Sequence, residues 1–80
     1  MTVPMRTRIC DVMSLVFNLP AVALGDNPEI MQVRGWDSLG HAQLMLALEE
    51  AFEVSISQSD VIELQSLDEI EVFLTTRGTN

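Results

Sequence analysis

The sequence predicts an all-α fold: a four-helix bundle with three longer helices, a short third helix, and a long loop between the first and second helices. Of the 80 residues, 48% are hydrophobic, but only 5% are aromatic and none is tyrosine, which favours aliphatic helix packing over a sheet sandwich. Two Ser-x-x-acid patterns mark helix starts. Because a chain this short can bury only one modest core, we expect a single domain over residues 1–80.

The first helix is predicted over residues 4–18. Pro4 suits the first turn of a helix, and Pro20 closes the segment. Residues 19–36 contain prolines, glycines and scattered apolar side chains, which together predict a long ordered loop pinned by its own apolar residues. The apolar residues of the first helix fall on one stripe at a period of 3.6: Met5, Ile9, Val12, Met13 and Val16.

The second helix is predicted from Ser38 to about Phe52, because this segment contains strong helix formers and no proline. Asp37 precedes it, and its carboxylate can accept a hydrogen bond from a first-turn N–H. Two later Ser-x-x-acid pairs, with the spacing of a capping box, open a short third and a final fourth helix: Ser57 with Asp60, and Ser66 with Glu69. Arg77 and Gly78 are placed to end the last helix.

The charge of the chain excludes some partners and favours others. The net charge is −8, and between Asp37 and Thr76 there are nine acids and no Lys or Arg. Such a surface repels nucleic acid and anionic membranes and attracts proteins with basic patches. A solvated acidic face without a partner is the alternative explanation. No apolar run approaches the roughly 18 residues that span a bilayer, so we expect no membrane insertion and a cytoplasmic location.

Few residues suggest catalysis. Cys10 is the single cysteine, so an internal disulfide is excluded, and one Cys with one His does not assemble a metal site. We expect Cys10 to act as a small hydrophobe and His41 to pack or to contact the loop. The sequence contains no recognisable acid–base pair or activated nucleophile, and it therefore predicts a protein that is not an enzyme.

The second helix has apolar side chains on two faces. A helical wheel centred on Leu44 predicts a core stripe with Ala47, Leu48 and Ala51, and with Phe52 at one edge. The opposite face combines apolar residues with acids: Leu39, Ala42 and Leu46 with Glu49, Glu50 and Glu53. An apolar strip rimmed by acids is typical of a protein docking site. Packing of Leu39 and Leu46 under the long loop is the alternative.

Ser38 lies in the first turn of this helix, where unpaired N–H groups and the helix dipole favour a phosphate ester. On local chemistry alone, an ordinary helix start explains Asp37-Ser38 better than a modification site does.

Residues 36–52, WDSLGHAQLMLALEEAF, resemble the signature of acyl carrier proteins of the stand-alone bacterial type, in which Asp-Ser-Leu opens the second helix. Nearly the whole chain fits this pattern. The resemblance implies a 4′-phosphopantetheine arm on Ser38, attached by a phosphopantetheinyl transferase whose divalent cation and basic surface recognise Asp37. It also implies a docking face on the strip that the wheel predicts, which we define as Asp37, Leu39, Ala42, Leu46, Glu49 and Glu50.

The chain departs from the family pattern by lacking two acids that are common there. Many members have an acid directly after Asp-Ser-Leu, whereas this chain has Gly40 and His41, and Gln43 replaces another residue that is commonly negative. The variant Trp-Asp-Ser-Leu-Gly-His looks more like carriers that are dedicated to a specialised pathway.

The resemblance implies an acyl carrier protein that holds acyl intermediates as thioesters and presents them to enzymes of fatty-acid, polyketide or specialised acyl-transfer pathways. The implied partners are the transferase and acyl-loading and acyl-transferring enzymes with basic docking patches, and we expect a monomer. Two alternatives are an aminoacyl or peptidyl carrier and an unmodified acidic helical adaptor. A cleft that shelters the acyl chain is a further hypothesis, with the lining Leu44, Leu48, Phe52, Val61 and Phe73.

Overall fold

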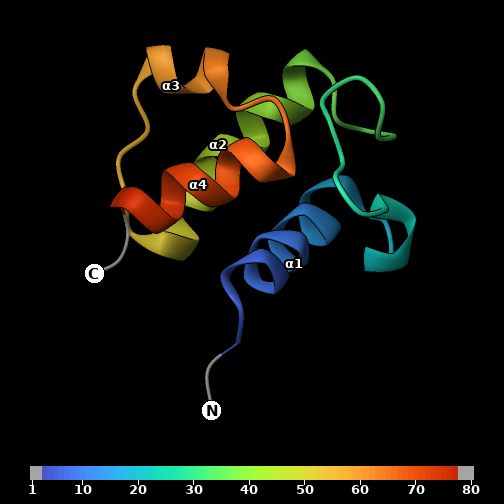
Figure 1. Ribbon diagram of the computed structural model, residues 1–80. Coiled ribbons are helices and arrows are strands. Elements are labelled where there is room, and N and C mark those ends of the chain that lie inside the picture. Colours follow the sequence, from blue (N-terminus) through green and yellow to red (C-terminus); the bar gives the residue numbers. More distant parts are fainter. Residues whose placement is uncertain (1–2, 78–80) are drawn as a thin grey trace.

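The computed structural model describes residues 3–77 (Figure 1). The elements in chain order are α1 (Met5–Phe17), the 3-10 helix η1 (Ala21–Leu24), α2 (Ser38–Phe52), α3 (Gln58–Glu63) and α4 (Leu67–Arg77). An isolated antiparallel bridge joins Glu29 to Ser66, and the described residues form no longer strand. The predicted all-α, four-helix architecture is confirmed. Among residues 3–77, no helix combines the length and apolar character needed to cross a bilayer.

The helix boundaries follow local signals in the sequence. Pro4 precedes α1, and Asn18 ends it in the left-handed conformation with φ 56°, in agreement with the predicted span 4–18. The second helix begins at Ser38 and ends at Phe52, as predicted. The short helix η1 was not predicted, because four residues are too few for periodicity to show.

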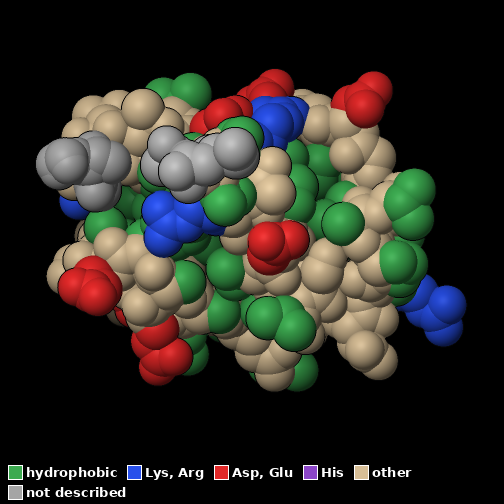
Figure 2. Space-filling model, turned by 90° about the horizontal axis from the view of Figure 1, so that it is seen from below, with side chains coloured by type: hydrophobic (Ala, Val, Ile, Leu, Met, Phe, Trp, Pro, Cys, Tyr) green, Lys and Arg blue, Asp and Glu red, His purple; other side chains and the backbone are tan. Residues whose placement is uncertain are grey.

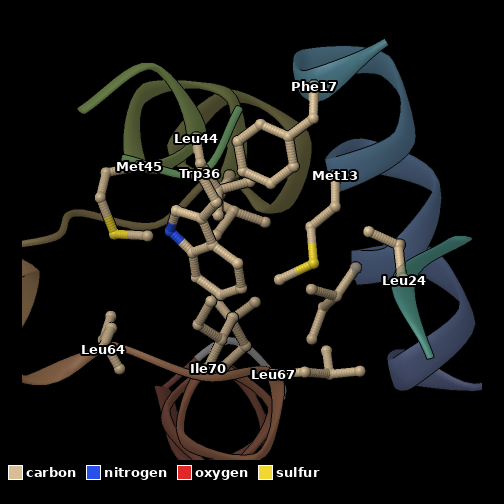
Figure 3. Close-up of a cluster of buried hydrophobic side chains, with 12 residues drawn as sticks. Met13, Phe17, Leu24, Trp36, Leu44, Met45, Leu64, Leu67 and Ile70 are labelled. Atoms are coloured by element: carbon tan, nitrogen blue, oxygen red, sulfur yellow. The ribbon is translucent and has the colours of Figure 1, made fainter. Parts of the chain in front are cut away.

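The helix α1 packs on α2, α4 and η1, so it is the central contact element of the bundle (Figure 1). Trp36, which comes from the loop, fills the space between these helices. Its side chain is fully buried and lies among Met13 and Phe17 of α1, Leu44 of α2 and Ile70 of α4 (Figure 3). The Phe17 and Trp36 rings stack with centroids 5.6 Å apart. The prediction that apolar residues pin the loop is therefore confirmed at Trp36.

The buried face of α2 is turned slightly from the predicted one. Leu44 and Leu48 are fully buried, as expected, but Ala51 is exposed and Ala47 is only half-buried. Met45 is buried instead. The side that carries Met45 packs in the core around Trp36 (Figure 3), and the two alanines lie at the border with α1.

Backbone hydrogen bonds fasten the long loop to the connection between α3 and α4. The Ile30 N–H donates to the Gln65 carbonyl at 2.8 Å, and the Leu67 N–H donates to the Pro28 carbonyl at 2.9 Å. Arg6 of α1 adds ion pairs to Asp68 at 2.8 Å and Glu71 at 2.7 Å, and it donates to the Asp26 carbonyl at 2.5 Å. The loop that leads to Ser38 is therefore tied at several points to the helices.

Of the two predicted capping boxes, one forms completely. Ser57 and Asp60 satisfy each other's backbone N–H groups at the start of α3. At the start of α4, the Ser66 hydroxyl accepts the Glu69 N–H at 3.3 Å, but the Glu69 carboxylate accepts the N–H of Gln65 at 3.0 Å instead of that of Ser66. The α4 helix ends at Arg77, and the predicted contribution of Gly78 lies outside the described residues.

The cap of α3 generates a pH prediction. The hydroxyl and the backbone N–H of Ser57 donate to Asp60, and these hydrogen bonds lower the pKa of its carboxyl from the usual 3.8. A carboxyl whose pKa is lower in the folded state contributes stability that is present above its unfolded pKa and is lost as the pH falls through its folded pKa. We expect the stability advantage of the wild type over Asp60→Asn to stay constant from about pH 7 to 5 and to shrink below about pH 4. Urea denaturation followed by circular dichroism at each pH measures this difference, and an advantage unchanged down to about pH 2 would contradict the assignment.

Candidate functional site

The first turn of α2 exposes Ser38 and leaves backbone donors free beside it. The Asp37 carboxylate accepts the Gly40 N–H at 2.9 Å, as predicted for an N-cap, and the Asp37 carbonyl accepts the His41 N–H at 2.7 Å. The N–H groups of Ser38 and Leu39 have no acceptor among residues 3–77. Because α2 is 15 residues long, these donors stand at the positive end of a substantial dipole. The exposed Ser38 hydroxyl therefore lies where an anionic ester would be stabilised.

Gly40 is required by the close approach of the loop to α2. A Cβ added at Gly40 would overlap the carbonyl oxygen of Gly35 and would lie 3.4 Å from the Asp37 carboxylate. Gly35 itself has φ 91°, a conformation that favours glycine. Any larger side chain at position 40, an acid included, requires the loop to shift away from α2. The pair Gly35 and Gly40 was the available signal in the sequence, where Gly40 was interpreted only as a missing acid.

His41 connects three segments of the chain through hydrogen bonds. The Trp36 Nε1–H donates to His41 Nδ1 at 2.9 Å, so the proton of the neutral imidazole is on Nε2, which donates to the Val61 carbonyl at 2.7 Å. The two rings also stack, with centroids 6.1 Å apart. His41 is 7% exposed. This confirms the expectation of a packing, loop-contacting histidine, and both ring nitrogens are engaged in holding the site together.

The docking face is largely open to solvent. Leu39 is 70% exposed and Leu46 is 63% exposed, so the alternative in which the loop covers these two leucines is wrong. Ala42 lies between them on the same side of the helix and is also exposed. The structure thus brings Leu39, Ala42 and Leu46 onto one uncovered strip of α2.

The three acids of the docking face differ in their surroundings. Asp37 and Glu50 are exposed, whereas Glu49 is half-buried. One oxygen of the Glu49 carboxylate accepts the Ile56 N–H at 2.7 Å, and this bond secures the connection between α2 and α3. Sequence reasoning missed this structural role, because it depends on a loop that folds back onto the helix. The role of the six residues in docking remains a prediction.

The hypothetical acyl cleft has a different lining from the expected one. Leu44 and Leu48 are fully buried in the core, where they do not line an open cleft. A groove of about 380 Å³ between α3 and α4 includes Phe73 but none of the other four expected residues. A smaller groove of about 270 Å³ lies directly beside Ser38, with the lining Ile30, His41, Val61, Ile62 and Gln65.

The acids and the cysteine are relevant to two further kinds of chemistry, those of a metal site and of a reactive thiol. Among the described residues, no three or more His, Cys, Asp or Glu side chains are placed to hold a metal ion. Cys10 is half-buried, and burial raises the pKa of its thiol, which favours the protonated and unreactive form.

The chain matches a family of known proteins. The model of the family described as "phosphopantetheine attachment site" matches residues 7–74. The matched segment includes the whole of α2 and α3 and most of α1 and α4.

The packing of Gly35 against Gly40 predicts the effect of a small substitution. In an ordinary helix interior, Gly→Ala stabilises by roughly 0.5–1 kcal/mol. Here the obstacle is a backbone carbonyl, so we expect Gly40→Ala to destabilise by about 1–3 kcal/mol, as overpacking does. Urea denaturation measures the free energy of unfolding, and Gln43→Ala, at an exposed position of the same helix, is the matched control. A Gly40→Ala protein more stable than the wild type would show that the loop can move away without cost.

The hydrogen bonds from Trp36 to His41 and from His41 to Val61 predict that substitutions at Trp36 and His41 lower the free energy of unfolding and that their effects are not additive. His41→Leu leaves a buried indole N–H and the Val61 carbonyl without their partner, which costs about 1–3 kcal/mol for a buried unsatisfied group. Trp36→Phe removes the donor together with part of the buried volume of the indole, and the second loss is present in both the single and the double variant. We expect the double variant to lose less stability than the sum of the two single variants, because they share one hydrogen bond. Strict additivity of the unfolding free energies would contradict this bond.

Proposed function

Because the chain belongs to the phosphopantetheine attachment family, we propose that it is an acyl carrier protein with its arm on Ser38. Family membership implies a covalently attached 4′-phosphopantetheine and a carrier rather than a catalyst. It also implies contact with a phosphopantetheinyl transferase and with partner enzymes. When bound, the group supplies a terminal thiol that holds a cargo as a thioester.

The observation that carries the proposal is the exposed Ser38 hydroxyl beside the free N–H groups of the first turn of α2. This donor set fits a phosphodiester, because the dipole and the unpaired amides favour negative charge at this position. The serine is accessible to a modifying enzyme, and the Trp36–His41 hydrogen bond holds the loop against the helix start. The chain therefore presents the arm from a rigid position.

An acyl cargo is favoured over an aminoacyl or peptidyl cargo by the net charge of −8, since strong acidity is more usual of acyl carriers. Within that class, the variant Trp-Asp-Ser-Leu-Gly-His, with a glycine at position 40 that packs on the Gly35 carbonyl, supports a carrier of a specialised acyl-transfer pathway over the main carrier of lipid synthesis. An acid at this position would meet the Gly35 carbonyl. We therefore expect the partner enzymes to recognise a docking face without a negative charge at position 40.

We propose that partners with basic patches bind the docking face. The exposed strip of Leu39, Ala42 and Leu46 supplies apolar contact area, and the exposed acids Asp37 and Glu50 steer the encounter. Steering of this kind is screened by salt. The net charge opposes self-association, which supports a monomer, and a single protonated thiol at Cys10 suits a reducing cytoplasmic location.

Intact-mass spectrometry tests the carrier function. We expect the wild-type protein, incubated with coenzyme A and a broad-specificity phosphopantetheinyl transferase, to gain the mass of one phosphopantetheine. Ser38→Ala should gain none, because the acceptor hydroxyl is absent. Ser59→Ala, at an exposed serine of α3, should gain the same mass as the wild type.

Each other outcome has a definite meaning. No gain on the wild type would favour the unmodified acidic adaptor, and a gain on Ser38→Ala would refute the attachment site. For the holo protein isolated under conditions that preserve thioesters, the additional mass of the cargo separates an acyl from an aminoacyl or peptidyl group.

A further inference from the structure

An apolar groove lies between α1 and α2, at the edge of the docking face and away from Ser38. Its volume is about 300 Å³, and five of its six lining side chains are apolar: Val12, Leu15, Val16, Ala47 and Ala51, with Glu50 as the single acid. The groove exists because α2 contributes alanines, whose small side chains leave the space beside α1 unfilled. The exposure of Ala51, which the helical wheel placed in the core, has the same origin.

Leu15 borders this groove and is 82% exposed. A single exposed leucine needs no explanation, but this one adjoins two half-buried valines of α1 and the two alanines of α2. Apolar side chains that reach the surface between acids are also visible when the molecule is seen from below (Figure 2). The groove is therefore an apolar surface with space for an inserted side chain.

The groove is continuous with the docking face. Glu50 belongs to both surfaces, and Leu46 of the docking face precedes Ala47 of the groove in the sequence. From Ser38 to the groove residues Ala47 and Ala51, the helix rises about 14–20 Å at 1.5 Å per residue. A partner that reaches both the arm and the groove must therefore lie along most of α2.

Charge indicates what covers the groove. Glu50 is exposed and has no ion-pair partner among residues 3–77, and the exposed Asp11 lies one turn before Leu15 on α1. A second copy of this chain would add another net charge of −8. Arg8, one turn before Val12 on α1, is exposed, but its guanidinium already lies over the Phe52 ring, 4.4 Å from the ring centroid. A cationic surface with a large apolar side chain is complementary to both the acids and the hollow.

We propose that the α1–α2 groove extends the docking surface and receives a basic amphipathic helix of the enzyme that loads or unloads the arm. One leucine-sized or aromatic side chain enters the groove, and an arginine or lysine one turn away pairs with Glu50. The proposal rests on the proposed carrier function, because it assigns the groove to that carrier's partners.

The probe is a synthetic amphipathic helical peptide with leucines on one face and arginines on the other. Its Kd is measured by fluorescence anisotropy with three proteins: wild type, Leu15→Ser and Val22→Ser. Val22 is the matched control, because it is 87% exposed but lies on η1, outside the groove. Both positions are open to solvent, so neither substitution threatens the core.

We expect Leu15→Ser to weaken peptide binding about five- to thirtyfold, as the loss of one buried aliphatic contact implies, and Val22→Ser to change it less than twofold. Amide shifts in the 15N-labelled wild type should concentrate at Val16, Ala47 and Ala51. Equal affinities for the two variants, or shifts concentrated at the α3–α4 groove near Leu64 and Phe73, would overturn the proposal. A dimer of the wild type that dissociates on Leu15→Ser would also overturn it, by showing that a second copy is the occupant.

The mass assay on the same proteins separates this proposal from the carrier function. If wild type and Leu15→Ser both gain phosphopantetheine while their peptide affinities are equal, the groove assignment is wrong and the carrier function stands. A wild type without the mass gain refutes the carrier function whatever the peptide shows.

Discussion

The structure depends on the hydrogen-bonded chain that runs from Trp36 through His41 to Val61. Trp36 fills the centre of the core, so the loop that carries it has one favourable position against the helices (Figure 3). His41 lies on α2 and forms hydrogen bonds with both Trp36 and Val61, so the position of Trp36 also restricts the positions of α2 and of the short helix α3. Since α3 has no buried residues of its own, this bond and its cap are important for its placement.

Ser38 lies two residues after Trp36 and three before His41, so the serine is held between two anchored side chains. Its own side chain makes none of these contacts and remains exposed. An exposed hydroxyl whose neighbouring residues are held in place suits a site that several enzymes bind one after another. The same arrangement leaves the docking face uncovered, because the loop is drawn towards the core and away from Leu39 and Leu46.

Much of this could be predicted from the sequence. The four helices and the start of α2 at Ser38 follow from local periodicity, caps and prolines, which act within a few residues. The rest depends on tertiary contacts. The exposure of Ala51, the bond from the Ile56 N–H to Glu49 and the close approach of the Gly35 carbonyl to Gly40 each involve segments that no local pattern brings together. The Glu69 carboxylate accepts the backbone N–H of Gln65 in place of that of Ser66, at the connection that the bridge from Glu29 to Ser66 ties to the loop.

The contact between Gly35 and Gly40 restricts how this carrier can change its partners over evolution. Negative charge close to the arm can be acquired at an outward-facing position such as Gln43, but position 40 opens only if the preceding loop is rebuilt at the same time. With this loop, a single substitution that adds an acid at position 40 carries a cost in stability. Backbone geometry, as well as charge, therefore limits which partner surfaces the start of α2 can come to match.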